Sequence, residues 1–535
     1  MVTADEREIE WQFDAPSTRA VSTWLGKPEG WADLGPVRVG ARRAATQVDL
    51  YLDTSDWRFR RAGYALRIRR VGRRGEATLK SFDSDGPETP GLRNRRELTE
   101  RLAAPEPKLL RKAGGEVGER VRAVAGTKPL RPLFEVRTRR RAFSVEADGL
   151  PPAELALDDT VIQPPGDAEP ARLHRVEVEG PEATLEALEP FLGRLRADCK
   201  LEPGGESKYG TGLLAAGLGP PVPARFGSTA VTPELTIDAV ALAVLRRHLS
   251  AMLENEPGTR LGDDVEALHR MRVATRRLRA ALSLFADVLP PDAESANEEL
   301  RWVGGALGAV RDLDVQLETL DEFPDLRALL ERERATARAE MLAALDSRRY
   351  RAFVTAFGRL LRARRSAPDP PVPARAIAPD LIETRFRAMR KAGRGLRPAS
   401  PTTDYHRLRN RSKRLRYALE FLADVYPGKT ERLTKSVVAL QDLLGEQQDA
   451  VVAIERLAQL AVDPSVGPET VFAMGELAER RRLGMAGLRK RFPATYDRVT
   501  GKRWTKLRNV LEKQRPEPPP PAVAPPEPSS VERPE

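Results

Sequence analysis

Residues 269–279 read HRMRVATRRLR and residues 406–416 read HRLRNRSKRLR, so one basic pattern occurs twice at an offset of 137 residues. The same offset relates a second block, Leu307-Gly308 with Asp312 and Leu444-Gly445 with Asp449. Two blocks in one register argue against coincidence, and their surroundings follow the 3.6-residue period of helices. The pattern therefore predicts a duplicated helical domain over residues 233–510, with repeats at about 233–365 and 380–510.

Within each copy, helix positions i, i+3, i+7 and i+10 carry a histidine followed by three cations. Because each residue of an α-helix advances about 100°, these positions share one narrow face. Apolar residues lie elsewhere on the same helices, so each helix buries one side and presents a basic stripe on another. The stripe residues are His269, Arg272, Arg276 and Arg279 in the first copy and His406, Arg409, Lys413 and Arg416 in the second.

These stripes are either ordinary solvated helix faces or surfaces that bind an anion. Residues 406–416 contain six bases and no acid, and like charges at i,i+4 cost about 0.2–0.5 kcal/mol per pair, which favours a bound anion. A metal site is disfavoured because neither histidine has a carboxylate or second histidine three or four residues further on. Nucleic acid is disfavoured because only Tyr405 and Tyr417 flank the stripes as stacking residues.

Proline-rich segments divide the rest of the chain. GLGPPVPARFG at 217–227 predicts a first domain at 1–216 and a linker at 217–232. SAPDPPVPARAIAPD at 366–380 separates the two helical repeats. Residues 511–535 are rich in proline, which predicts a disordered tail.

Composition narrows the class of protein. The chain has 535 residues, of which 41% are hydrophobic and 31% charged, as expected for globular domains. Its one cysteine, Cys199, excludes an internal disulfide and a cysteine-based zinc site. A formal net charge of +11 favours a polyanionic partner. Without a signal peptide or an apolar run of membrane-spanning length, we expect a cytoplasmic protein with no membrane partner.

In the first half of the chain, charged and apolar residues alternate. Glu8, Glu10 and Gln12 alternate with apolar residues, as in a strand with one charged face. Similar alternation surrounds Arg67 and Arg69, Arg95 and Glu97, Arg137 and Arg139, Asp158, and Glu177 and Glu179. Taken singly, such strands are ordinary. Because some carry only acids and others mainly bases, a common interior would let acids hold divalent cations and bases hold phosphate oxygens.

The helical half resembles the CHAD domain, through H-x-x-R-x-x-x-[RK]-R-L-R on two helices and the L-G-x-x-[RQ]-D segments. This resemblance implies that the stripes bind inorganic polyphosphate. Residues 1–216 resemble the CYTH domain of the triphosphate tunnel metalloenzymes, through EIEWQF (8–13), YLDTSDWRFRRAGYALRIRR (51–70), ATLK (77–80) and SKYG (207–210). The implied fold class is α+β, with an antiparallel eight-stranded β-tunnel followed by an all-α domain of duplicated helical bundles.

The CYTH resemblance also implies an activity, the metal-dependent hydrolysis of inorganic tri- or polyphosphate or of an organic triphosphate, with Mg²⁺ or Mn²⁺ as cofactor. The implied metal ligands are Glu8, Glu10, Asp158, Glu177 and Glu179. The implied triphosphate-binding residues are Arg67, Arg69, Lys80, Arg95, Arg137, Arg139 and Lys208, and Glu97 would bind metal or orient an arginine. Glu8, Glu10, Arg67, Arg69, Lys80, Arg137 and Arg139 form the implied catalytic set. Some family members cyclise ATP, but no adenine-reading feature is visible in the sequence.

One residue departs from the family's opening signature E-x-E-x-K, because Gln12 stands where the lysine belongs. An amide can donate a hydrogen bond to phosphate but cannot neutralise its charge, and losing one such group commonly lowers a rate by ~10²–10³. Two hypotheses follow. The chain is a triphosphatase that tolerates Gln12, which the retained carboxylates favour, or a non-catalytic polyphosphate-binding protein with a degenerate tunnel.

Overall fold

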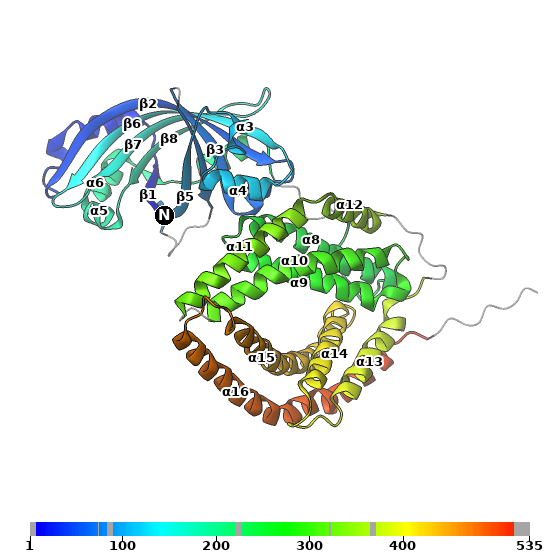
Figure 1. Cartoon of the computed structure of the whole chain (residues 1–535). Coiled ribbons are helices and arrows are strands. Elements are labelled where there is room, and N and C mark those ends of the chain that lie inside the picture. The colour runs from blue at the N-terminus through cyan, green and yellow to red at the C-terminus, as the bar shows by residue number, and fades with distance from the viewer. Residues whose placement is uncertain are drawn as a thin grey trace, which may run out of the picture. The chain divides into compact units, whose positions relative to one another are not determined.

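The computed structural model describes residues 7–72, 74–82, 89–219, 226–319, 323–363 and 371–517. They form two compact units (Figure 1). One comprises residues 1–225, 251–272 and 339–348, and the other comprises 226–250, 273–338 and 349–535. Parts of the predicted linker (220–225), inter-repeat segment (366–370) and tail (518–535) lie outside the described residues.

Nine strands form the sheet of the first unit. They are β1 (Arg7–Asp14), β2 (Val37–Thr54), β3 (Tyr64–Val71), β4 (Arg74–Ser81), β5 (Leu92–Leu102), β6 (Leu130–Ala147), β7 (Ala153–Gln163), β8 (Ala171–Glu179) and β9 (Glu202–Pro203). The strand order is β5-β4-β3-β2-β6-β7-β8-β1-β9, and β5 also pairs with β1. All of these pairings are antiparallel. The β1–β5 pairing closes eight strands into a ring, which confirms the predicted eight-stranded antiparallel tunnel.

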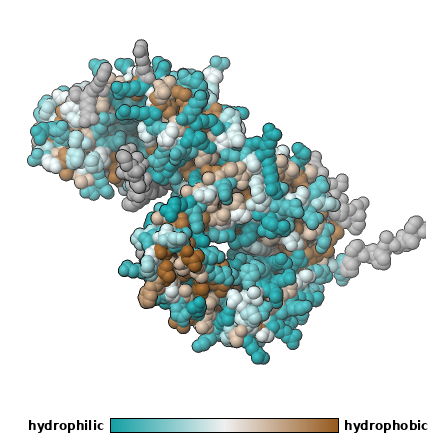
Figure 2. All heavy atoms as spheres, in the orientation of Figure 1, coloured by the Kyte–Doolittle hydropathy of each residue, from teal (hydrophilic) through white to brown (hydrophobic). Residues whose placement is uncertain are grey.

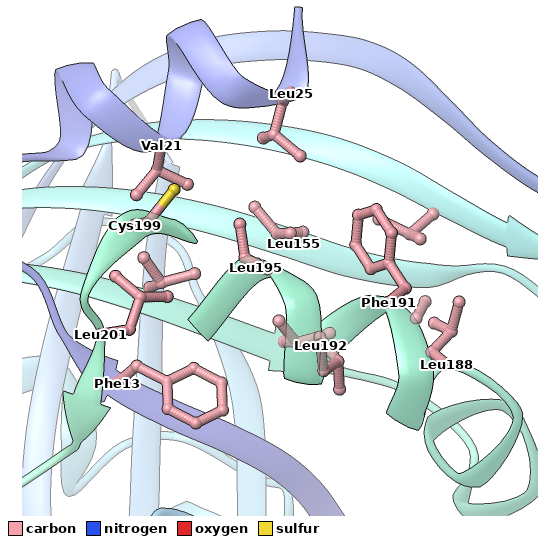
Figure 3. Packing of buried hydrophobic residues seen from close by; sticks show 14 of the residues in the cluster. Phe13, Val21, Leu25, Leu155, Leu188, Phe191, Leu192, Leu195, Cys199 and Leu201 are labelled. Carbon is pink, nitrogen blue, oxygen red and sulfur yellow. The ribbon is translucent and has the colours of Figure 1, made fainter. Parts of the chain in front are cut away.

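The short helices of this unit are α1 (Thr18–Leu25), η1 (Pro28–Gly30), α2 (Arg58–Arg61), α3 (Pro107–Leu110), α4 (Glu116–Ala125), α5 (Glu182–Ala187), α6 (Glu189–Cys199) and α7 (Lys208–Ala215). Alternation along the strands decides what these helices cover. Phe13 of β1 and Leu155 of β7 are fully buried in one apolar cluster with Phe191 and Leu195 of α6 (Figure 3). The apolar faces of these strands therefore pack outward on helices, which leaves the charged faces for the interior.

A second set of helices follows along the chain. These are α8 (Ile237–Leu261), α9 (Val265–Leu284), η2 (Ala286–Val288), α10 (Ala293–Thr319), α11 (Pro324–Asp346), α12 (Arg348–Arg362), α13 (Ala374–Gly393), α14 (Thr402–Phe421), α15 (Glu431–Leu460), α16 (Pro468–Thr500) and α17 (Lys502–Lys513). α17 extends past residue 511, into the predicted tail. The strand-rich tunnel followed by helices confirms the predicted fold class.

The helix boundaries reproduce the sequence repeat. α13 begins 137 residues after α8, and both ends of α14 lie 137 residues after those of α9. The paired Leu-Gly segments lie inside α10 and α15, the next helices of each copy. Each copy therefore has the same opening succession of three long helices.

Polar residues cover most of the face shown in Figure 2. None of the helices in the described ranges has an apolar stretch long enough to cross a membrane.

Candidate functional site

The interior of the ring of strands contains a cavity of about 400 Å³. β1, β3, β4, β5, β6 and β8 contribute its charged side chains, and the first residues of α7 complete the lining. The seven basic residues are Arg67, Arg69, Lys80, Arg95, Arg140, Arg175 and Lys208, and the five acidic residues are Glu8, Glu10, Glu97, Glu177 and Glu179. The structure thus brings together most of the predicted tunnel residues in one place.

Three carboxylates surround the ammonium group of Lys80. Its Nζ contacts Glu8, lies 3.1 Å from Oε1 of Glu10 and lies 3.4 Å from Oε2 of Glu97. Buried Oε2 atoms of Glu8 and Glu97 have no hydrogen-bond partner among the described residues. Three acids share one cation, so this end of the cavity has an excess of negative charge.

The pKa values of these carboxyl groups reflect that crowding. Burial, and then the neighbouring Glu10, raise the pKa of Glu8 to about 9. Burial alone would also raise the pKa of Glu97, but the charges of Arg67 and Lys80 lower it to about 2. Burial, with Glu10 and Glu97, raises the pKa of Glu179 as well. An additional cation would relieve this repulsion.

These residues fit a divalent metal ion by their donor chemistry, because clustered carboxylate oxygens are the ligands that Mg²⁺ and Mn²⁺ prefer. Within the described ranges, no three acidic, histidine or cysteine side chains form a ready-made metal site. In the tunnel, Lys80 contacts the same oxygens that a metal ion would use. The implied ligands Glu8 and Glu10 therefore lie together, and Glu97 joins them.

The other two implied metal ligands are engaged by cations of the protein. Arg140 donates to both Asp158 oxygens, at 2.8 and 2.7 Å, and also contacts Glu177. Nζ of Lys208 lies 2.5 Å from Asp158 and 3.0 Å from Glu177. Burial would raise the pKa of Glu177, but Lys208 and Arg140 hold it well below its usual range. Asp158 is fully buried, and its role here is to fix these two cations.

The predictions for β6 were wrong by one residue. Arg137 and Arg139 lie on the outer face of the strand, where Arg137 is 62% exposed, whereas Arg140 lines the cavity. Side chains alternate along a strand, so a shift of one residue reverses the face. The apolar Val136 was expected to point away from the interior, but it packs against Tyr51 and Tyr209 of the cavity lining. Arg139-Arg140-Arg141 offers an arginine in either register, so composition could not decide.

Sequence reasoning missed Asp49 and Arg175. Asp49 of β2 is buried and accepts a bidentate pair from Arg69, at 2.8 and 2.9 Å, with Arg67 3.6 Å away. Burial would raise the pKa of Asp49, but these two arginines lower it. Arg175, 1% exposed, donates to Asp14 at 2.9 Å. Both continue the alternation already noted, at Val48-Asp49-Leu50 and two residues before Glu177, which is the signal that would have found them.

Gln12 uses its amide in a single direction. Its Nε2 donates to Oε1 of Glu10 at 2.8 Å, which fixes the amide orientation because a carboxylate only accepts. The amide Oε1 is buried without a partner among the described residues, in the lining of the cavity. Gln12 therefore orients a carboxylate instead of adding a positive charge.

The basic stripes occupy α9 and α14, as predicted. His406 is exposed and its Nδ1 lies 2.8 Å from Oε1 of Gln448, while Arg416 donates to Glu420 at 2.5 Å. Burial lowers the pKa of Arg409, with Asp449 opposing and Arg276 reinforcing the shift. Burial also lowers the pKa of Arg279, with the nearby charge of Arg301. Cations on both helices thus repel one another, which favours an anion beside them.

Known proteins resemble both parts of the chain. A family model described as CYTH domain matches residues 33–190, and one described as CHAD domain matches residues 243–458. The chain is 28% identical over 418 residues to "Uncharacterized protein Rv2226" of Mycobacterium tuberculosis strain H37Rv, covering 69% of this chain and 77% of that protein.

Two solved structures illustrate the separate likenesses. The CHAD domain from the plant Ricinus communis is 30% identical at a TM-score of 0.43, covering 50% of this chain and 93% of its own. A Hippeastrum protein described as having a dominant triphosphatase activity is 19% identical at a TM-score of 0.28, covering 40% and 98%. With the closed ring of antiparallel strands and the two helical repeats, the family matches establish that this chain contains a CYTH domain followed by a CHAD domain.

Proposed function

We propose that the CYTH tunnel hydrolyses the terminal phosphoanhydride bond of inorganic triphosphate or polyphosphate, or of an organic triphosphate. The observation that carries this proposal is the division of charge within one cavity. Glu8, Glu10 and Glu97 gather at one group, and seven cations line the same space. Phosphoryl transfer needs little beyond positioning and neutralisation of charge, and such a cavity provides both.

A divalent metal ion bound by Glu8 and Glu10, with Glu97, would supply charge neutralisation and an activated water. The chain's own residues do the rest. Asp49 holds the Arg67 and Arg69 guanidinium groups in place, so their remaining N–H groups are preorganised for phosphate oxygens. Asp158 does the same for Arg140 and Lys208. Water adds to the terminal phosphorus, the bridging P–O bond breaks, and the shortened phosphate leaves with the bond's electron pair.

The test is phosphate release from tripolyphosphate by the full-length protein with Mg²⁺, with Mn²⁺ and with EDTA. A Glu8→Gln/Glu10→Gln variant is compared with Glu135→Gln/Glu146→Gln, which changes the same charge on β6 away from the cavity lining. We expect release that requires metal and that only the first variant abolishes. Equal release by the two variants would overturn the proposal.

The second candidate function is polyphosphate binding without catalysis, which Gln12 favours because its amide adds no positive charge to the tunnel. In either case we propose that the stripes on α9 and α14 bind inorganic polyphosphate. The mutual repulsion of Arg276 and Arg409 supports this assignment, since a phosphate chain would offset it. Polyphosphate that fails to compete with DNA for the full-length protein would contradict the assignment.

A further inference from the structure

A second basic cavity lies apart from the stripes, where the segment before α15 and the first turn of α15 meet the first turns of α17. Its volume is about 730 Å³. Six of its ten lining residues are basic: Lys429, Arg432, Lys435, Lys502, Arg503 and Lys506. The other four are Gly428, Leu433, Leu507 and Val510. None of them belongs to the stripes or to the tunnel.

These cations lack the partners that arginine and lysine have elsewhere in the protein. On α13, for example, Arg387 pairs with Glu383 at 2.7 Å. In the part of the chain that the structure describes, no carboxylate lies within 4.0 Å of any of the six cations. Arg503 donates to the Ser436 hydroxyl, a neutral group. The positive charge of this cavity is therefore not balanced by the described residues.

The helix ends add to that charge. α17 begins with Lys502 and Arg503, has no acidic residue in its first turn, and receives no side-chain cap from Gly501. Thr430, which precedes α15, also gives no side-chain cap. The start of a helix carries a partial positive charge and free N–H groups, so it favours anions and disfavours cations. Cations at these positions make sense when an anion joins them.

The two helix ends are held firmly, so the cations are presented on a rigid scaffold. Trp504 of α17 stacks on Phe386 of α13, with ring centroids 3.7 Å apart and an interplanar angle of 7°. Leu507 of α17 and Leu433 of α15 are buried beneath the cavity lining. Such a site loses little side-chain and backbone freedom when it binds a ligand.

We propose that this cavity is a second binding site for inorganic oligophosphate. Six uncompensated cations require a ligand with several negative charges, and arginine forks and lysine ammonium groups both suit phosphate oxygens. The lining contains no aromatic side chain on which a base could stack, which disfavours RNA. The site extends the polyphosphate binding proposed for the stripes, and it does not depend on catalysis in the tunnel.

The experiment is lysine acetylation of the full-length protein in EDTA, read residue by residue by mass spectrometry, with and without sodium polyphosphate. At about ten times the Kd we expect labelling of Lys435, Lys502 and Lys506 to fall about tenfold, because only free protein reacts. Lys391 and Lys490, exposed lysines outside both sites, serve as internal controls.

The outcomes separate this site from the stripes, which contain Lys413. Protection of Lys413 alone would overturn the second site, and protection of the cavity lysines alone would overturn the stripes. Protection of the cavity lysines by an RNA oligonucleotide or by phosphatidylserine vesicles, but not by polyphosphate, would overturn the assigned ligand.

A variant provides the matching affinity measurement. Lys435→Gln/Lys502→Gln/Lys506→Gln removes three unpaired charges, and Lys112→Gln/Lys391→Gln/Lys490→Gln removes the same charge elsewhere. We expect the first to lose about tenfold or more in polyphosphate affinity and to show a weaker dependence on NaCl, since fewer counterions are released. Equal affinities for the two folded variants would refute the site.

Discussion

At the scale of single residues, Gln12 sets the charge beside Glu10. Its amide donates to Glu10 and adds no charge, whereas a lysine at this position would neutralise phosphate. We expect Gln12→Lys to raise kcat for tripolyphosphate by about tenfold or more, within the range that one preorganised charge contributes. Steady-state phosphate release tests this, with Gln163→Lys at an exposed position as the control for net charge. An unchanged or lower kcat would show that the amide does not limit the tunnel.

His248 gives the CHAD domain a predictable pH dependence. Burial, reinforced by the charges of Arg277 and Arg247, lowers its pKa from 6.5 to about 4. Between these values the unfolded state binds the proton and the folded state does not, so the free energy of unfolding falls as pH drops from about 6.5 to about 4. The contribution is on the order of 3 kcal/mol.

Urea denaturation at several pH values tests this expectation. His248→Phe keeps a ring beside Phe421, whose centroid lies 5.4 Å from that of His248, but cannot titrate. We expect the variant to lose less stability than the natural protein between pH 7 and pH 4.5. Parallel losses in the two proteins would contradict the lowered pKa.

At the scale of elements, the register of β6 decides which arginine reaches the cavity. We expect Arg140→Gln to lower kcat/KM for tripolyphosphate by ~10²–10³, whereas Arg139→Gln on the outer face leaves it unchanged. Arg140→Lys restores the charge without the bidentate fork and should recover part of the loss. Thermal melting of each variant controls for folding, since Asp158 loses its partner. Similar kinetic effects of the glutamine variants at 139 and 140 would disprove the register assignment.

The sequence predicted elements better than it predicted faces. Alternation in β1 and β3 gave correct inward residues because each inward charge is flanked by apolar residues that pack outward, such as Leu66 and Ile68 around Arg67. The three successive arginines of β6 carry no such signal. The second basic cavity was not visible either, because Lys435 and Lys502 come together only through the stacking of Phe386 on Trp504.

At the scale of the whole molecule, two compact units divide the proposed roles. Metal ligands are expected only in the tunnel, since the CHAD sites consist of cations. We therefore expect EDTA to abolish phosphate release and to leave polyphosphate binding intact. Phosphate assays and calorimetric titration on one protein preparation measure both. Polyphosphate binding that disappears with EDTA and returns with Mg²⁺ would contradict this division.

The pairing of β5 with β1 has a topological consequence for the proposed substrate. A continuous hoop of strands has no slit along its side, so a linear polymer can be threaded through it only by a free end. The terminus of the polymer would thus be consumed one unit at a time, and mid-length fragments would not accumulate. A ring-shaped metaphosphate, which has no terminus to present, would be left intact.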